Sequence, residues 1–333
     1  MIKKTMRRPF LSLAAIAIAL TLLSWGSWGH QHINRAAVFA LPPEMRTFFY
    51  NHIDFITEEA VIPDTRKSID KGEFNRHFID LENYLPNPGD SMPQTMKDVT
   101  AKYDAKFLES NGILPWYMEE MTDKLTRAFR NKSKDEILYL AADLAHYIGD
   151  AHMPLHTAVN YDGQLTNQKG IHSFWESQLP EMFGDGYNFN TGDAVYIPDV
   201  HNEIRRIIAH THSLIDTVLA AEKTARASLT EDQLFEKDAS GNLIRNKYNQ
   251  TKRSQAYATA FHTALNGMVE RQMRMSIAAV SGFWYTAWVN AGKPDLSGLD
   301  PASLTDRNRK FFKKDYKRWQ KGQLFGFKAE NEY

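Results

Sequence analysis

Two pairs of histidine and carboxylate residues near the middle of the 333-residue chain have the spacing of metal ligands. His146 and Asp150 are four residues apart, so on a helix they project from one face, one turn apart. His172 and Glu176 repeat this spacing. Zinc accepts imidazole and carboxylate ligands where thiolates are lacking, and the chain contains no cysteine. The two pairs therefore predict metal ligation, and the full list of candidate ligands, namely Trp25, His30, Asp64, His77, His146, Asp150, His156, His172 and Glu176, points to a hydrolase that uses several zinc ions.

A third histidine extends this group. Pro154 cannot continue a helix that carries His146 and Asp150, so His156 is expected just past the helix end, in the same region. The competing interpretation is a helical protein whose histidines are satisfied by hydrogen bonds in the core. Two pairs and a further histidine within roughly thirty residues favour metal ligation. Manganese stays open as the metal, because sites built from His and Asp accept several divalent ions.

The order of the candidate ligands resembles the zinc-dependent superfamily that joins fungal and plant single-strand-specific nucleases with bacterial phospholipases C. The motifs that carry the resemblance are Trp25-Gly-x-x-Gly-His30, Asp64, His77-Phe-Ile-Asp80, His146-x-x-x-Asp150 followed by Pro-Leu-His156, and His172-x-x-x-Glu176. The resemblance covers roughly residues 25 to 290. It implies an all-α fold, a single compact multi-helix domain with a cleft that holds three zinc ions.

The resemblance also implies which residues hold each ion. The implied ligands of the first Zn2+ are Asp64, His77, His146 and Asp150. Those of the second are His30, the bridging Asp150, and the amino nitrogen and carbonyl oxygen of Trp25. Those of the third are His156, His172 and Glu176. Glutamate in that last position is typical of the phospholipases, whereas the nucleases more often have aspartate.

The N-terminus has the layout of a secretory signal. Residues 1–24 contain Lys and Arg at positions 3, 4, 7 and 8, followed by an apolar run from Phe10 to Leu23 that is short for a membrane span. Cleavage after Ser24 would free the amine of Trp25 for the metal, whereas the alternative role of Trp25 is a buried ring. Leu22 is an unusual residue three positions before the cut. We expect an exported protein, periplasmic or secreted, and a twin-arginine signal is the weaker alternative.

The mature chain reads as mostly helix. Apolar residues recur at three- and four-residue spacing in Arg35 to Tyr50 and beyond, Ser133 to Ile148, Val200 to Ala221 and Ala256 to Ala291. Ser133 and Glu136 have the spacing of a capping box. Three stretches are expected to be loops, namely Leu85–Asp90, Phe183–Gly186 and Glu236–Ser254. The domains predicted are a catalytic domain over residues 25–295 and a basic extension over 296–333, and no later segment is apolar enough to span a membrane.

Charge is unevenly distributed along the chain. The whole sequence has no net charge, but Asp306 to Lys328 contains nine basic and two acidic residues, so the rest of the mature chain is acidic. An acidic body argues against tight binding of duplex DNA, which depends on many Lys and Arg contacts to phosphate. The basic stretch Arg307 to Lys321, interleaved with aromatic residues, is expected either to contact nucleic acid or anionic lipid or to form a solvated helical tail.

The predicted reaction is hydrolysis of a phosphodiester. Zinc ions acidify bound water and can serve the attacking and leaving oxygens of an in-line displacement. By resemblance, Asp150 and Asp64 are catalytic, with Asp64 orienting the water, and the third ion stabilises the departing oxygen. Lys67 lies where the nucleases place a basic residue beside the transition-state charge. The alternative for Lys67 is an ordinary surface lysine.

The substrate is the harder prediction. Phe78 corresponds to an aromatic on which the nucleases stack a base, and Asp80 to a carboxylate that accepts hydrogen bonds from the base edge. Stacking on Phe78 requires an unpaired base and so favours single strands, unless Phe78 only packs in the core. Glu176 and the short stretch between His156 and His172 favour a phospholipase C instead. The leading prediction is an endonuclease that leaves 5′-phosphates on single-stranded DNA or RNA.

Two other classes compete with these readings, a zinc-binding protein without turnover and a two-metal phosphomonoesterase. Apart from three Zn2+ and the nucleic acid or phospholipid substrate, the sequence predicts no partner. No nucleotide cofactor and no integral membrane span are expected, and a monomer is expected.

Overall fold

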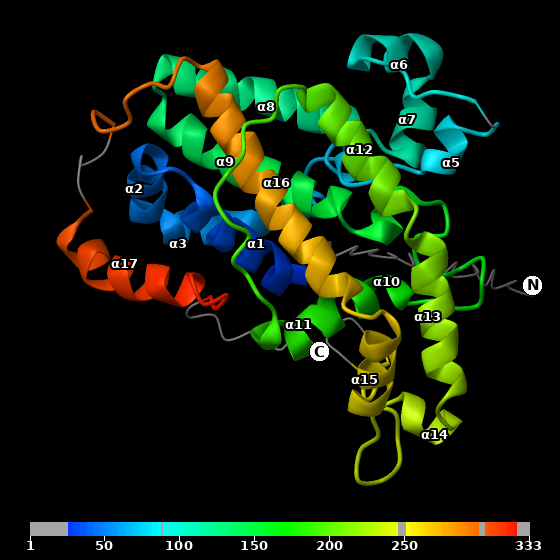
Figure 1. Cartoon of the computed structure of the whole chain (residues 1–333). Helices are drawn as coiled ribbons and strands as arrows, with labels where there is room; N and C mark the ends of the chain where they lie inside the picture. Colours follow the sequence, from blue (N-terminus) through cyan, green and yellow to red (C-terminus); the bar gives the residue numbers. More distant parts are fainter. Residues whose placement is uncertain (1–25, 88, 246–250, 300–303, 325–333) are drawn as a thin grey trace, which may run out of the picture.

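The computed structural model describes residues 26–87, 89–245, 251–299 and 304–324. These residues form helices and connecting segments, and β pairing in them is limited to isolated bridges. The expected all-α fold is therefore confirmed (Figure 1). None of the helices in the described part of the chain has the length and apolar character that crossing a bilayer requires. The predicted signal over residues 1–24 and the ligand Trp25 lie outside the described residues.

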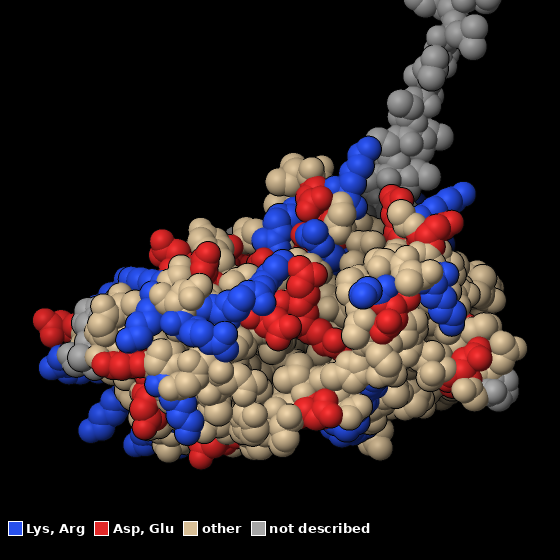
Figure 2. Space-filling model, turned by 90° about the horizontal axis from the view of Figure 1, so that it is seen from above, with Lys and Arg blue, Asp and Glu red and all other residues tan. Residues whose placement is uncertain are grey.

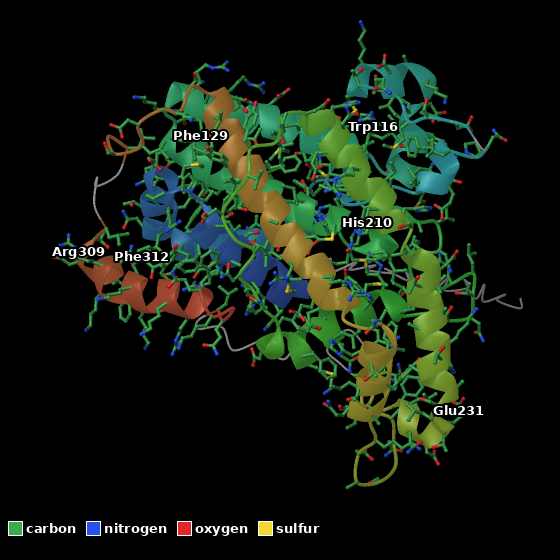
Figure 3. The ribbon with its side chains drawn as sticks, viewed as in Figure 1. Trp116, Phe129, His210, Glu231, Arg309 and Phe312 are labelled. Atoms are coloured by element: carbon green, nitrogen blue, oxygen red, sulfur yellow. The ribbon has the colours of Figure 1, made fainter. Side chains whose placement is uncertain are left out.

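Four long helices form the centre of the molecule: α1 (Gly26–Ala40), α8 (Leu114–Asn131), α9 (Lys134–Ala151) and α16 (Met268–Asn290). Each packs against other members of this group. Trp116 and Phe129, near the two ends of α8, are both buried (Figure 3). The indole of Trp284 on α16 donates to the carbonyl of Ala141 on α9 over 2.9 Å. Full burial of a large apolar side chain stabilises a fold by roughly 1.5–3 kcal/mol, so this centre holds the site's supporting helices rigidly.

Shorter elements surround this centre. Before α8 lie α2 (Pro43–Asn51), α3 (Ile53–Glu58), η1 (Glu59–Val61), α4 (Ile62–Arg66), η2 (Phe74–Arg76), α5 (Leu81–Tyr84), α6 (Met96–Lys102) and α7 (Ala105–Asn111). After α9 lie η3 (Pro154–Thr157), α10 (Ile171–Ser173), η4 (Phe174–Gln178), α11 (Leu179–Phe183), η5 (Gly184–Gly186), α12 (Val200–His212), α13 (Ile215–Ala227), α14 (Glu231–Leu234), α15 (Gln255–Ala264) and α17 (Asp306–Trp319). On the face seen in Figure 2, basic and acidic side chains lie side by side.

The helix expected from Arg35 to Tyr50 is two helices. The first, α1, begins earlier, at Gly26, and ends at Ala40. The second, α2, begins at Pro43. Pro42 and Pro43 lack the amide hydrogen that a continuous helix needs, and proline disfavours helical backbone in the residue before it. The prolines therefore divide the segment and let α2 turn away from α1.

Two other expected helices are also divided. The stretch Val200 to Ala221 forms α12 and α13, with a break at Ser213 and Leu214. The stretch Ala256 to Ala291 forms α15 and α16. There the backbone enters the left-handed region at Asn266, with φ of 48°, and at Gly267, with φ of 74°. Asparagine and glycine adopt that conformation at low cost, so the chain can turn between the two helices.

The helix α9 begins where the sequence predicts, but the predicted capping interaction does not form. Ser133 is the N-cap residue, but its side chain makes no capping hydrogen bond, so the expected capping box with Glu136 is absent. Asp135 and Glu136 still place negative charge in the first turn, where the helix dipole favours it. The helix continues to Ala151, past the expected end at Ile148, and stops before Pro154 as predicted.

The three stretches expected to be loops differ in their observed structure. The described residues of Leu85–Asp90 form no helix or strand, as predicted. Phe183–Gly186 is not a loop, because it joins the end of α11 to the turn η5. Isolated antiparallel bridges cross the polar stretch Glu236–Ser254, joining Lys237 to Leu243 and Arg245 to Thr251. Neither outcome affects the elements that carry the candidate ligands.

Candidate metal centre

Three sets of His, Asp and Glu side chains meet where the central helices approach the short elements. Within each set the candidate ligand atoms all lie within 4.8 Å of one another. These sets are His30, Asp64 and His146; His77, His146 and Asp150; and His156, His172 and Glu176. Because the first two sets share His146, we divide their ligands into a first group, Asp64, His77, His146 and Asp150, and a second group, Asp150 and His30. The third group is His156, His172 and Glu176. These residues come from α1, α4, α9, η3, α10, η4 and the residue after η2. Every candidate ligand from the sequence that the structure describes therefore takes part.

The first group surrounds a single point. His77 Nδ1 lies 2.9 Å from Asp150 Oδ2 and 3.1 Å from His146 Nε2. His146 Nε2 lies 3.4 Å from Asp150 Oδ2. Asp64 Oδ1 completes the group at 3.6 Å from His146 and 3.7 Å from His77. Tetrahedral ligands about 2.0–2.1 Å from a zinc ion lie about 3.3 Å apart, so these four atoms fit one zinc ion.

Asp150 faces two ion positions at once. Its Oδ2 atom belongs to the first group, and its Oδ1 atom lies 3.5 Å from His30 Nε2. The Oδ1 atom is buried and accepts no hydrogen bond. A buried carboxylate oxygen without a donor is costly, and a cation between Asp150 and His30 would satisfy it. This geometry fits the predicted bridging role of Asp150, while the contribution of Trp25 stays a prediction.

The third group also combines a carboxylate with buried imidazole nitrogens. Glu176 Oε2 lies 3.4 Å from His156 Nε2 and 3.3 Å from His172 Nε2. Both histidine nitrogens are buried and make no hydrogen bond. These separations again suit three residues that would hold one zinc ion.

The outer ring nitrogens of these histidines are already held by backbone carbonyls. His146 Nδ1 lies 2.8 Å from the carbonyl of Ala60, and His156 Nδ1 lies 2.7 Å from that of His77. His172 Nδ1 lies 2.9 Å from the carbonyl of Tyr161. Donation to a carbonyl fixes the tautomer, so each inward Nε2 presents a lone pair, as metal ligation requires. Core histidines satisfied only by hydrogen bonds would not leave their inward nitrogens grouped with carboxylates.

A local irregularity positions His172 and Glu176. The segment Phe174–Gln178 is a single π-helical turn that follows the short helix α10. Gly170 precedes it with φ of 87°, and the Asp162 carboxylate accepts hydrogen bonds from the amides of Gly170 and His172. Single π-turns are frequent at functional sites because they reorient side chains within a helix. The i, i+4 spacing seen in the sequence is thus realised on a widened turn.

Sequence reasoning missed the group that orients His77. Glu73 is fully buried, and its carboxylate accepts from Arg76 at 2.7 Å, from Arg66 at 3.3 Å and from the Tyr147 hydroxyl. Its Oε1 atom lies 3.3 Å from His77 Nε2, the nitrogen that faces away from the first group. A carboxylate behind a ligand histidine fixes the ring and raises its basicity. The four-residue spacing of Glu73 and His77 was the available signal.

Electrostatics keep the acidic ligands ionised. Burial raises the pKa of Asp64, but the charges of Lys67 and His146 outweigh burial and hold that pKa below its usual value. Burial likewise opposes ionisation of Asp150, and the neighbouring His146 and His156 lower its pKa well below the usual range. Burial lowers the pKa of His30 to about 4, with His146 adding to the effect. Burial lowers the pKa of His146, but Asp150 and Asp64 outweigh it and raise that pKa to about 10, so a cation bound by these carboxylates would displace a proton from His146.

Lys67 is part of the site rather than a surface lysine. Its ammonium nitrogen lies 2.7 Å from Asp64 Oδ1, and only 11 % of its side chain is exposed. It lines a cavity of about 270 Å3 together with His77, His156 and His172. A positive charge in this position can meet an anionic group that enters the cavity.

Phe78 and Asp80 line the same cavity, while their role in binding a base stays a prediction. Phe78 is only partly buried, and its ring meets that of Phe74 edge to face at 5.3 Å, so it is not a core residue. Its backbone is clamped by Gly112, where φ is 76° and any Cβ would lie 1.9 Å from the Phe78 carbonyl oxygen. Burial, aided by the charge of Glu82, raises the pKa of Asp80 to about 7.

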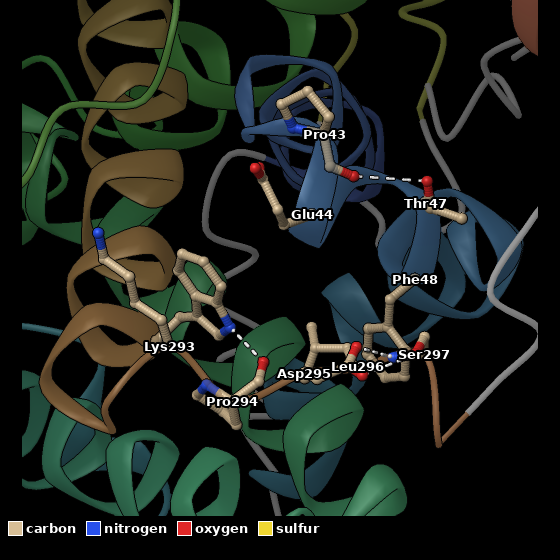
Figure 4. A pocket seen from close by; sticks show the side chains of 10 residues that line it. Pro43, Glu44, Thr47, Phe48, Lys293, Pro294, Asp295, Leu296 and Ser297 are labelled. Atoms are coloured by element: carbon tan, nitrogen blue, oxygen red, sulfur yellow. Dashed lines mark hydrogen bonds between the residues drawn. The ribbon is translucent and has the colours of Figure 1, made fainter.

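Two larger cavities contain none of the ligand side chains. One, of about 370 Å3, lies between α2 and the segment after α16 and is lined by Phe48, Trp288 and Lys293 (Figure 4). The other, of about 380 Å3, lies beside α12 and α16. Size therefore does not identify the reactive site, whereas the convergence of ligands does.

The alpha-toxin of Clostridium perfringens from an avian strain is similar in structure, with a TM-score of 0.42 and 16% identity. The match covers 76% of this chain, which spans 64% of the toxin's length. No curated protein sequence matches the chain. The sequence model of the S1/P1 nuclease family matches residues 25–276, which is most of the chain and includes every candidate ligand described above. The chain therefore belongs to the S1/P1 nuclease family.

Proposed function

We propose that the mature protein is an exported, zinc-dependent endonuclease that hydrolyses single-stranded DNA and RNA and leaves 5′-phosphates. Membership of the S1/P1 nuclease family supports a nuclease-type phosphodiester hydrolase. The observation that carries the finer proposal is the cavity in which Phe78 and Asp80 stand beside ligands of the first and third groups. A base and its phosphate can bind there together.

The proposal assigns three zinc ions to the three ligand groups. Asp64, His77, His146 and Asp150 would hold the first, Asp150, His30 and the Trp25 backbone the second, and His156, His172 and Glu176 the third. Zinc ions bound there would supply positive charge to the phosphate oxygens and lower the pKa of water. A free amine on Trp25 requires removal of residues 1–24, so export and metal binding are linked in this proposal.

The chain's own residues orient the reacting groups. Asp64 can accept a hydrogen bond from the attacking water, which aligns it with the phosphorus atom. Lys67, held 2.7 Å from Asp64, places its ammonium where negative charge develops on the phosphate oxygens. Because both side chains are almost fully buried, these interactions are strengthened by the low local dielectric.

Phe78 supports a preference for single strands. Base stacking on an aromatic side chain contributes roughly 1–3 kcal/mol per base and needs an unpaired base. Asp80 would accept hydrogen bonds from the edge of the stacked base. A stacked duplex offers neither the base face nor its pairing edge to the cavity.

Glu176 favours the second candidate function, a phospholipase C. The two functions separate when the same zinc-loaded protein is given single-stranded DNA or RNA and, in parallel, phosphatidylcholine vesicles. We expect rapid cleavage of the nucleic acids, 5′-phosphate ends, and loss of activity with a chelator that added zinc restores. Hydrolysis of the vesicles alone would replace the proposal with the phospholipase.

Phe78→Ala tests the role of the cavity directly. Loss of stacking worth roughly 1–3 kcal/mol predicts a fall in kcat/KM on single-stranded DNA of about 5- to 150-fold. Turnover of a small chromogenic phosphodiester, which carries no base, should change little. The control is Tyr139→Ala, which removes an exposed aromatic ring from α9. Equal losses on both substrates would show that Phe78 is only structural.

We further propose the region 25–295 as the catalytic domain and a monomer as the working form. All candidate ligands that the structure describes lie within this region, which supports the proposal. Size-exclusion chromatography with light scattering on the exported protein tests the monomer, and N-terminal sequencing tests cleavage before Trp25.

A further inference from the structure

Helix α17 exposes a row of basic side chains. The exposed members are Arg307, Arg309, Lys310, Lys313, Lys314, Lys317 and, just beyond the helix, Lys321. The helix contains two acidic residues, Asp306 and Asp315. Because Asp315 is buried, Asp306 is the one exposed acidic residue within α17. We call these seven basic residues the α17 basic face.

The opposite side of α17 is already packed on the body. Trp319 is buried with its ring 6.1 Å from that of Phe39, and Phe312 meets Tyr50 at 4.9 Å. The Tyr50 hydroxyl donates to the buried Asp315 carboxylate over 2.7 Å. In Figure 3, Phe312 lies toward the body and Arg309 at its outer edge. The helix is therefore a fixed part of the surface and not a solvated tail.

This packing argues against membrane insertion. A helix that lies in a membrane interface needs a free apolar side, and Trp319 and Phe312 of α17 are engaged with α1 and α2. Among its large apolar side chains only Phe311 is exposed, at 39 %. The basic side chains are exposed to solvent while the apolar side is not, which suits a polyanion held by its phosphates.

The α17 basic face lies apart from the metal centre. In Figure 1, α17 is on the opposite flank from α7 and α10, whose Ser110 and His172 line the cavity. The remainder of the mature chain carries a net negative charge, whereas the α17 basic face is strongly positive, so this face is a favourable place for phosphates on the surface. A long strand can occupy both the metal centre and this face, whereas a dinucleotide reaches only one.

We propose that the α17 basic face is a second binding surface for nucleic acid, which holds the phosphate backbone of a long single strand while another part of that strand enters the cavity. The choice of nucleic acid over other polyanions rests on the proposed nuclease function. Contacts to the backbone carry no sequence preference, so this surface would raise the affinity for long strands without selecting bases.

The test compares two triple variants of the full exported protein. One replaces Lys310, Lys313 and Lys317 with Gln, and the control replaces the exposed Lys97, Lys102 and Lys223 with Gln. Both remove three positive charges from exposed positions. Binding of a nuclease-resistant phosphorothioate oligothymidine of about 30 nucleotides is measured over a range of salt concentrations, together with unfolding temperatures and turnover of a dinucleotide.

We expect the α17 variant to bind the oligonucleotide about tenfold more weakly at low salt, and its slope of log K against log salt to fall by about 2. KM for long single-stranded DNA should rise while dinucleotide turnover and unfolding temperature stay unchanged. Equal affinities for the two triple variants would overturn the inference. So would loss of binding to phosphatidylserine vesicles with oligonucleotide binding intact, which would assign the surface to membranes. Failure of the proposed function is distinct, because the unaltered protein would then cleave no nucleic acid.

Discussion

Individual residues behind the ligands are expected to control metal affinity. Glu73→Gln removes the carboxylate charge 3.3 Å from His77 Nε2 and leaves a side chain of similar size. Loss of such a partner typically weakens metal binding about 10- to 100-fold. Competition with a chromogenic zinc chelator measures this change, and nuclease activity at limiting zinc should fall in parallel.

Glu119→Gln is the matched control for Glu73→Gln. Glu119 also lies between a histidine and an arginine, 2.8 Å from His201 and 3.1 Å from Arg205, but away from the ligand groups. We expect unchanged zinc retention in this variant. If both variants retain zinc as the unaltered protein does, Glu73 only neutralises Arg66 and Arg76 and does not position His77.

Asp80 should give substrate binding a pH dependence. Burial and Glu82 raise the pKa of Asp80 to about 7, so the carboxylate is protonated below that pH and accepts fewer hydrogen bonds. KM for single-stranded DNA should therefore rise as pH falls through 7. Glu82→Gln should lower the pKa of Asp80 and move this inflection to lower pH, because it removes a nearby negative charge.

The chromogenic diester provides the reference for this pH profile, since it has no base for Asp80 to bind. Asp80→Asn cannot ionise and should abolish the inflection for DNA. An inflection near pH 7 that survives Asp80→Asn would assign the titration to another group.

At the scale of elements, local spacing predicted those pairs of residues that lie on one regular helix. The pair His146 and Asp150 was recognisable because α9 is a regular helix that stops where proline requires it. The apolar periodicity of Val200 to Ala221 could not reveal the break at Ser213, because periodicity survives a short interruption when both halves pack on the same core. The π-turn at Phe174–Gln178 has no local signature either.

The remaining candidate ligands were predicted from the resemblance to a known family. Composition and local spacing could not identify them, because they meet only through contacts between distant elements. His30, Asp64 and His77 come from separate segments and carry no mutual spacing that indicates a shared ion. Glu73 was missed because its role depends on Arg66, Arg76 and Tyr147 closing around it in three dimensions. Long-range packing decides such groups, whereas residue order alone does not.

At the scale of the whole molecule, bound zinc is expected to stabilise the fold. The ligand groups join α1, α4, α9, η3 and η4, and no disulfide is possible in a chain without cysteine. One site at 100 to 1,000 times its Kd contributes about 3–4 kcal/mol. At about 2–4 °C per kcal/mol for a domain of this size class, a chelator should lower Tm by roughly 5–15 °C. Differential scanning calorimetry measures the shift.

Two comparisons test whether the change in Tm comes from zinc at these ligand groups. Zinc should restore Tm, whereas magnesium should not, because magnesium prefers oxygen ligands in octahedral geometry and these groups are rich in imidazole. His156→Ala removes one ligand of the third group and should reduce the chelator-dependent shift, while His201→Ala, which alters a partly exposed histidine outside the groups, should leave it unchanged. A Tm that is the same with and without chelator would mean that the clustered carboxylates are tolerated without cations, and the zinc assignment would then be wrong.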